Sequence, residues 1–130
     1  MKPVETKFAP PAIGPYSQAM IAGDLVFTSA QLAMDPKDPD SGLVPGGISR
    51  QAERVLENLK QVLEAAGSGL NHVVKTTCYL ASMADFAAFN AIYIKFFPHK
   101  PARACITAKQ LPRDALLMVE AIAEVVRKQG

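Results

Sequence analysis

The alternation of apolar and polar positions predicts strands near both ends of the chain and in its middle. Residues 17–33, SQAMIAGDLVFTSAQLA, have the pattern of two strands joined by a tight Gly-Asp turn. Residues 72–80 are rich in β-branched side chains, which favour extended structure. Two further apolar segments, 102–107 and 115–126, complete the set of predicted strands.

Helical periodicity occupies the two segments between these strands. In residues 48–67 apolar side chains recur every three or four positions, charged and amide side chains fill the opposite face, and Gly67 is a natural C-terminal stop. A second helix is predicted after Ser82, which with Asp85 resembles a capping box, and this helix ends before Pro98.

The order of these elements is typical of an α+β domain with one mixed sheet. The last strand, 115–126, is apolar on both faces and therefore needs cover on both sides. Because right-handed crossovers tend to place both helices on one face, we expect a second copy of the chain to cover the other face in an obligate homo-oligomer. The alternative is that the proline- and glycine-rich loop 34–47 and the N-terminal segment cover it.

Composition and charge narrow the classes of function. The chain has 130 residues, which suits one domain spanning 1–130, and its net charge of +2 without a basic run argues against nucleic acid or an anionic membrane as partner. Glu120 and Glu124 interrupt the longest apolar stretches, so no membrane span is expected. The N-terminus has no secretory signal and the two cysteines form no CxxC motif, so we expect a cytoplasmic protein.

Three polar residues occupy positions where the periodicity calls for apolar ones. These are Asn90 on the second helix and Arg103 and Glu120 on the last two strands. A guanidinium keeps its charge, so Arg103 needs an anionic partner. Glu120 falls between Met118 and Ile122 on its face of the strand, and a carboxylate there needs either a partner or a raised pKa.

Two interpretations of Arg103 and Glu120 are open. If residues 111–114 turn the last two strands into a hairpin, the two side chains lie opposite each other and form a structural ion pair. Alternatively, they are two ends of one pocket. Arginine can bind a carboxylate through two parallel hydrogen bonds, and a glutamate can direct a water. Together these tasks describe hydrolysis at the carbon next to the carboxylate of a small acid.

Other chemistries lack the necessary residues. His72 and His99 have no Cys, Asp or Glu at metal-ligand spacing, and the sequence contains no GxSxG motif. Residues 67–69, Gly-Ser-Gly, lack the lysine of a phosphate-binding loop. Cys105 is interpreted as a small core side chain rather than a nucleophile.

Six short segments occur in an order that resembles one known family. They are AIGPYSQA (12–19), TSAQ (28–31), VVKTT (73–77), DFAAFNAIY (85–93), PARAC (101–105) and VEAIA (119–123). Together they resemble the Rid family, the reactive intermediate deaminases also called the YjgF family. The resemblance implies a chorismate-mutase-like α+β fold, with two helices on one face of a mixed sheet, and a homotrimer with pockets at the subunit interfaces.

The resemblance also implies an activity and its residues. Members hydrolyse 2-imino acids and enamines, such as 2-aminoacrylate, 2-iminopropanoate and 2-iminobutanoate, to 2-oxo acids and ammonia, with no metal or organic cofactor. By position, Arg103 would bind the substrate carboxylate, Glu120 would position the attacking water, and Tyr16 would orient substrate or water. Asn90 would support the pocket or, equally, tie helix to strand as a buried amide. Further substrate contacts would come from Ser29, Ala30 and Cys105.

The sequence departs from the family pattern in three places. Ala30 stands where the family usually has glycine, which implies a tighter pocket and a smaller substrate. Met118 stands where a glutamate commonly precedes the catalytic one, so Glu120 is the acidic candidate in that stretch. Residues 96–100 are shorter than in several relatives, which changes the rim of the pocket.

Two other functions remain open from the sequence. One is a non-enzymatic trimeric module that binds small 2-oxo acids as a metabolic sensor, or acts as a holdase, and it would use the same Arg103 pocket. The other is an RNA-directed role, as a ribonuclease or translation inhibitor, which is proposed for some family members. Against that role, the sequence lacks a basic stripe and paired exposed aromatics.

Overall fold

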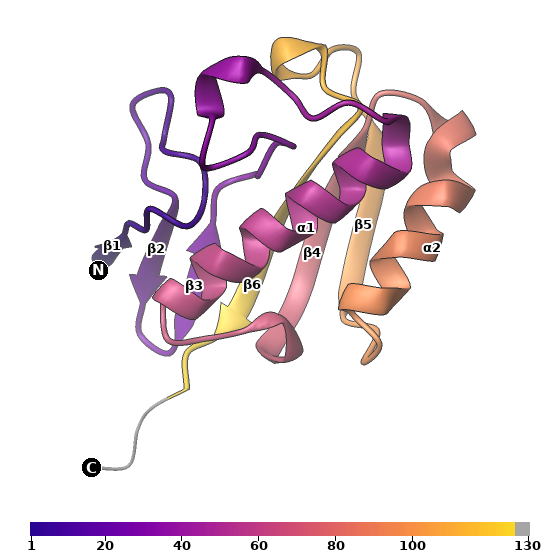
Figure 1. Ribbon diagram of the computed structural model, residues 1–130. Helices are drawn as coiled ribbons and strands as arrows, with labels where there is room; N and C mark the ends of the chain where they lie inside the picture. Colours follow the sequence, from indigo (N-terminus) through magenta and orange to yellow (C-terminus); the bar gives the residue numbers. More distant parts are fainter. Residues whose placement is uncertain (127–130) are drawn as a thin grey trace.

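Six strands form one mixed sheet in the computed structural model of the protein, which describes residues 1–126 (Figure 1). The order across the sheet is β1-β2-β3-β6-β4-β5, and every neighbouring pair is antiparallel except β4 and β5, which are parallel. The strands are β1 (Lys2–Val4), β2 (Ala19–Ala22), β3 (Leu25–Thr28), β4 (Val73–Leu80), β5 (Ala102–Thr107) and β6 (Leu117–Glu124). The five predicted strands are confirmed, and β1 is an addition that the pattern did not indicate.

Two α-helices lie on the same face of this sheet, as Figure 1 shows. Helix α1 spans Gly47–Ala65 and α2 spans Phe86–Phe96. Gly67 follows α1 with φ +81°, in the left-handed region that glycine adopts easily, which confirms it as the stop. Ser82 caps a short 3₁₀ turn rather than α2 itself, because its Oγ accepts a hydrogen bond from the Ala84 N–H. Short 3₁₀ turns occupy η1 (Pro39–Ser41), η2 (Leu70–His72), η3 (Met83–Asp85) and η4 (Pro112–Asp114).

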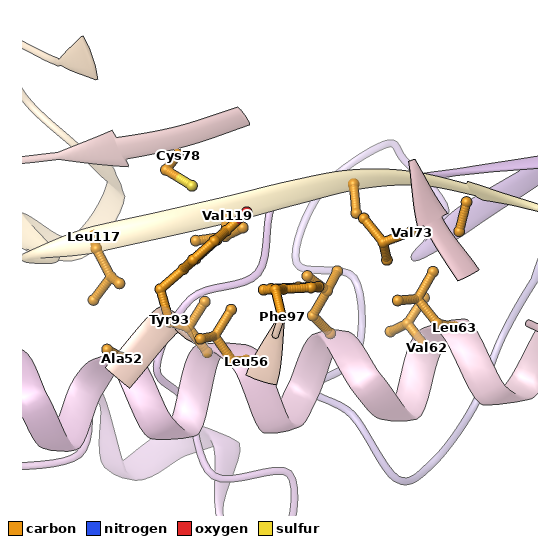
Figure 2. Packing of buried hydrophobic residues seen from close by; sticks show 14 of the residues in the cluster. Ala52, Leu56, Val62, Leu63, Val73, Cys78, Tyr93, Phe97, Leu117 and Val119 are labelled. Atoms are coloured by element: carbon orange, nitrogen blue, oxygen red, sulfur yellow. The ribbon is translucent and has the colours of Figure 1, made fainter. Parts of the chain in front are cut away.

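The hydrophobic core fills the space between the helices and the sheet. Leu56 of α1 faces Val119 of β6, and Leu63 lies nearer Val73 of β4 (Figure 2). Tyr93 and Phe97 from the second helical segment enter the same layer. These side chains are almost completely buried, and each contributes roughly 1.5–3 kcal/mol on burial. The core therefore holds both helices on one face and fixes the position of α2 against β4 and β5.

The opposite face of the sheet stays open in the chain. Strand register places Phe27 of β3 and Ile106 of β5 on this face, and they remain 42% and 50% exposed. Loop 34–47 does not cover them, because Asn58 of α1 donates hydrogen bonds to the carbonyl oxygens of Leu32 and Met34 at the start of the loop. The loop thus packs on the helix side, and cover by another copy of the chain stays a prediction.

The expected hairpin between the last two strands is wrong. Strand β4 lies between β5 and β6, so Arg103 is level with Thr76, which pairs with Ala121 on its other side. Glu120 is the next residue along β6 and therefore points to the opposite face from Arg103. The physical reason is the crossover through α2, which makes β5 a parallel neighbour of β4 and leaves the other side of β4 to β6.

Candidate functional site

Arg103 lies on the edge strand β5, with its side chain on the helix face of the sheet. Its Nη1 donates a hydrogen bond of 2.8 Å to the Asn90 Oδ1 on α2. The guanidinium carbon is 4.8 Å from the ring centroid of Tyr93 and 5.5 Å from that of Phe86. An amide oxygen and two aromatic faces therefore surround the cation, and we call Phe86, Asn90 and Tyr93 the arginine cradle.

No protein carboxylate pairs with Arg103 in residues 1–126. The two ion pairs in this part of the chain, Arg50 with Glu53 and Lys60 with Glu57, lie on the surface of α1. A guanidinium has five N–H donors, and the cradle uses one of them in a hydrogen bond. The internal ion pair with Glu120 is thus wrong, and most of the donors of Arg103 are available to an incoming anion.

The cradle is itself fixed by the core. The Tyr93 hydroxyl and the Thr76 Oγ1 are 2.7 Å apart, and Thr76 on β4 is completely buried. This bond sets the tilt of the ring on which the guanidinium lies. Asn90 fulfils one of its two proposed roles, because its hydrogen bond to Arg103 ties α2 to β5. Its support of a substrate pocket stays a prediction.

Glu120 lies on the open face of the sheet, beside Tyr79 of β4. The Tyr79 hydroxyl donates a hydrogen bond of 2.8 Å to the Glu120 Oε1. That bond, with a smaller contribution from burial, raises the pKa of the Tyr79 phenol. The second carboxylate oxygen has no hydrogen bond to residues 1–126, so it remains free to accept one from a water.

Ser29 and Ala30 form a bulge next to Glu120. Between the pairs Phe27–Ile122 and Gln31–Val119 the register shifts by one residue, so the backbone leaves the ladder at this point. The Ser29 Oγ donates to the Ser17 carbonyl at 2.6 Å. In the described part of the chain, no hydrogen bond satisfies the N–H or C=O of Ala30. These groups are therefore available for backbone contacts with a ligand.

Tyr16 lies far from Arg103 within one chain. It precedes β2, is 48% exposed, and accepts a hydrogen bond of 3.3 Å from the Ile13 N–H at its hydroxyl. It lines a cavity of about 640 Å³ between the N-terminal segment and the loop, and neither Arg103 nor Glu120 lines that cavity. Strands β2 and β5 are four places apart in the sheet, which is on the order of 19 Å at about 4.8 Å per strand.

Cys105 lies two residues after Arg103 on the same face of β5 and is half-buried. Burial raises the pKa of its thiol, and the charge of Arg103 opposes that rise. A strongly nucleophilic cysteine has a lowered pKa, so this environment agrees with the interpretation of Cys105 as a packing residue. Its proposed backbone contact with substrate stays a prediction.

The sequence has no metal-ligand spacing around the two histidines, and in the structure His99 is exposed and His72 is half-buried. Within residues 1–126, no three His, Cys, Asp or Glu side chains gather as a possible metal site. His99 Nε2 is 3.0 Å from the Val73 carbonyl oxygen, at the end of β4. In the same part of the chain, no helix is long and apolar enough to cross a membrane.

The structure thus brings together some of the expected residues and separates others. Arg103 and Asn90 are in contact, and Glu120 lies beside the bulge at Ser29 and Ala30. Sequence reasoning missed Phe86 and Tyr93 as contacts of Arg103, although both share the helical stripe of Asn90. It also missed Tyr79, whose contact with Glu120 depends on the register of β4 and β6.

Comparison with known proteins identifies the family. A family model described as Endoribonuclease L-PSP matches residues 6–125. The chain belongs to this family, the Rid or YjgF family. A RutC family protein of Pyrococcus horikoshii is 48% identical over 119 residues, covering 91% of this chain and 93% of that protein.

Two further relatives of this Rid family member have more specific descriptions. A Salmonella typhimurium protein named 2-iminobutanoate/2-iminopropanoate deaminase is 43% identical over 126 residues, covering 94% of this chain and 96% of that protein. The crystal structure of Escherichia coli TdcF with bound serine has a TM-score of 0.90 at 37% identity, covering 97% of this chain and 100% of that chain. The resemblance of the six segments to the Rid family is therefore confirmed.

Proposed function

We propose that this Rid family protein is a hydrolytic deaminase that converts small 2-imino acids and their enamine tautomers to 2-oxo acids and ammonia. The observation that carries the proposal is Arg103, a guanidinium held by a neutral amide and two aromatic rings, with no carboxylate of residues 1–126 paired with it. Such an arrangement keeps its charge for a ligand anion. The serine in the TdcF structure and the name of the Salmonella relative support a small substrate with a carboxylate.

The proposed site is completed by a second copy of the chain, in a homotrimer. Arg103 and Glu120 point to opposite faces of one sheet, and Tyr16 lies near the opposite edge from Arg103. One chain therefore does not close a pocket around all three. If β5 of one copy packs against the open face of the next, Arg103 meets the neighbour's Glu120 and bulge, and the half-exposed apolar side chains of that face become buried.

The reaction then needs little more than positioning. Arg103 holds the substrate carboxylate and so fixes the imine carbon beside it. Glu120 accepts a proton from a water whose oxygen bonds to that carbon, and the imine nitrogen gains a proton to give a carbinolamine. The carbinolamine hydroxyl then loses its proton, the amino nitrogen gains one, the carbon–nitrogen bond breaks, and ammonia leaves the 2-oxo acid. A positioned acid–base group contributes roughly 10²–10⁴-fold, which suffices for imines because they hydrolyse spontaneously.

The test couples the protein to a threonine or serine dehydratase and traps the released imine with semicarbazide. With wild-type protein present, the amount of imine trapped by semicarbazide should fall. With Arg103→Ala, the amount trapped should equal that of a reaction without the protein. Arg50→Ala, which removes an exposed arginine on α1, is the matched control and should behave as wild type. Near-wild-type hydrolysis by Arg103→Ala would refute the mechanism. Equal trapping with and without wild-type protein would favour the binding module.

The family description keeps an RNA-directed role as a second candidate. RNA binding through phosphates weakens steeply with salt, whereas hydrolysis of a small imine in a closed pocket does not. The net charge of +2 and the neutral cradle around Arg103 favour the small acid. RNA cleavage by wild-type protein that fell with salt and survived Arg103→Ala would support the second candidate.

A further inference from the structure

The two cysteines of the chain are register partners on adjacent strands. Cys78 of β4 lies directly opposite Cys105 of β5. Both side chains point to the helix face, because residues level with each other on neighbouring strands share a face. Neighbouring strands lie about 4.8 Å apart, which is inside the range of roughly 4.4–6.8 Å between Cα atoms joined by a disulfide. Both cysteines are free thiols in this structure.

The two cysteines differ in exposure, which suits a reaction that begins at Cys105 and is completed by Cys78. Cys105 is half-buried, so a small oxidant can reach it, whereas Cys78 is completely buried beneath the helices. A disulfide brings the Cβ atoms to about 3.8 Å, which is closer than the spacing of about 4.8 Å between neighbouring strands. Strand β5 can make this movement because it is the edge strand and pairs with β4 alone.

We propose that Cys78 and Cys105 are a modification site at which hydroperoxides form a reversible disulfide between β4 and β5. The Cys105 sulfur attacks one peroxide oxygen, the oxygen–oxygen bond breaks, and a sulfenic acid and one water result. The Cys78 sulfur then attacks the sulfenic sulfur, and the sulfur–oxygen bond breaks with release of a second water. The two thiols lose two electrons and two protons, and the peroxide is reduced to two waters. A thiol reductant returns both cysteines by disulfide exchange.

The reaction is slow by the standard of a redox enzyme. Burial raises the pKa of Cys78 to about 12, against a weaker opposing effect of its hydrogen bond with Thr76, and burial also raises the pKa of Cys105. The thiolate is the reactive form, so little of either cysteine is reactive at neutral pH. We expect disulfide formation over minutes to hours, the timescale of uncatalysed disulfide chemistry.

The disulfide would act next to the arginine cradle. Arg103 is two residues from Cys105 on the same face, and the Thr76 that holds Tyr93 is two residues from Cys78. Closing β5 on β4 therefore moves the strand that carries the guanidinium. The modification itself does not depend on the proposed deaminase activity, so thiol chemistry can test it separately.

The experiment exposes the full-length protein to hydrogen peroxide, blocks remaining thiols with an alkylating agent under denaturing conditions, and measures the intact mass. After peroxide, neither cysteine of wild type should be alkylated, and the intact mass should be that of a single chain. After a thiol reductant, both cysteines should be alkylated again. Cys78→Val, which keeps an apolar side chain of similar size, should instead give a sulfenic acid at Cys105 that dimedone traps. Cys105→Ser should keep its single thiol.

Three results would overturn the proposal. The first is wild-type protein that keeps both alkylation sites after hours in peroxide. The second is loss of thiols only as chains cross-linked through Cys105. The third is that peroxide removes each thiol equally fast in wild type and in the variant that lacks the other cysteine. The wild-type measurement does not depend on the folding of any variant, so it shows by itself whether the disulfide forms.

Discussion

The contacts of Arg103 differ from those of an arginine that stabilises a fold through an ion pair, and they support its proposed role in binding a ligand. An arginine that stabilises a fold commonly meets a carboxylate, and removal of that partner leaves a costly buried charge. Here the side chain is half-buried, one Nη atom donates to an amide oxygen, and the guanidinium carbon lies within 5.5 Å of two ring centroids. Cation–π contacts contribute roughly 0.5–2 kcal/mol, enough to orient the group without neutralising it.

Phe86→Leu tests the orienting role of the cradle. Leucine keeps an apolar side chain at this position but removes the ring 5.5 Å from the guanidinium carbon. A contact worth roughly 0.5–2 kcal/mol should raise KM by about 2–30-fold and leave kcat little changed, because the ring holds Arg103 equally in substrate and transition state. Steady-state kinetics with a coupled dehydratase measure both constants. Phe96→Leu, on the same helix but outside the cradle, is the control. An equal rise in KM for Phe96→Leu would contradict an orienting role of the Phe86 ring.

Tyr79→Phe tests the bond to Glu120 through its pH dependence. The bond raises the pKa of the phenol from its ordinary value of 10.0, so the protonated phenol is favoured by folding. Its stabilising contribution is complete below about pH 10 and is lost as the pH rises through the folded pKa. In urea titrations, wild type should exceed Tyr79→Phe in stability by a constant margin from pH 7 to 9, and the margin should shrink above pH 10. A margin independent of pH would contradict the bond.

The connection β4–α2–β5 explains why the cradle forms. One crossover brings Thr76, the α2 stripe and Arg103 to the same place, so residues that are close in sequence build this half of the site. The other half, the bulge after β3 beside Glu120, combines segments about 90 residues apart. Its position depends on the register between β3 and β6, which no local pattern encodes.

The bulge offers a test of substrate size. Ala30 contributes a methyl group beside its own backbone N–H and C=O, which have no hydrogen bond within residues 1–126. Ala30→Gly should raise kcat/KM for 2-iminobutanoate relative to 2-iminopropanoate by about 10-fold, since one methylene is worth roughly 1–3 kcal/mol of discrimination. Competition between the two imines in one trapping assay measures the ratio directly. An unchanged ratio of kcat/KM between the two imines would contradict a contact between Ala30 and the side chain of the substrate.

Sequence patterns predicted local elements well and long-range pairing poorly. The periodicity of residues 48–67 predicted α1, and Gly67 predicted its end, because both depend on neighbours within one or two turns. The hairpin through residues 111–114 failed, because two adjacent strands in sequence are hairpin partners only when nothing intervenes, and β4 does. Arg103 and Glu120 were correctly singled out as polar interruptions, but the face on which each lies follows from the sheet order.

Residues 1–126 present two surfaces with complementary chemistry. One is the edge formed by β5 and the cradle, where Arg103 has no carboxylate partner within these residues. The other is the open face with Glu120, Tyr79 and half-exposed apolar side chains. Because Arg103 and Glu120 point away from each other within a chain, the proposed pocket requires Arg103 from one copy and Glu120 from its neighbour. This sharing between copies is the central claim for function.

Mixing two inactive variants tests that claim most directly. Arg103→Ala and Glu120→Gln are each assembled alone and are each expected to be inactive in the imine trapping assay. When equal amounts of the unfolded chains are mixed and refolded together, about a quarter of the interfaces should pair an intact Arg103 with an intact Glu120, on random assembly of a symmetric ring. Activity should return to about a quarter of wild type, and variants mixed after separate assembly should stay inactive. No recovery in the co-refolded mixture, with both variants folded and assembled, would contradict a site shared between copies.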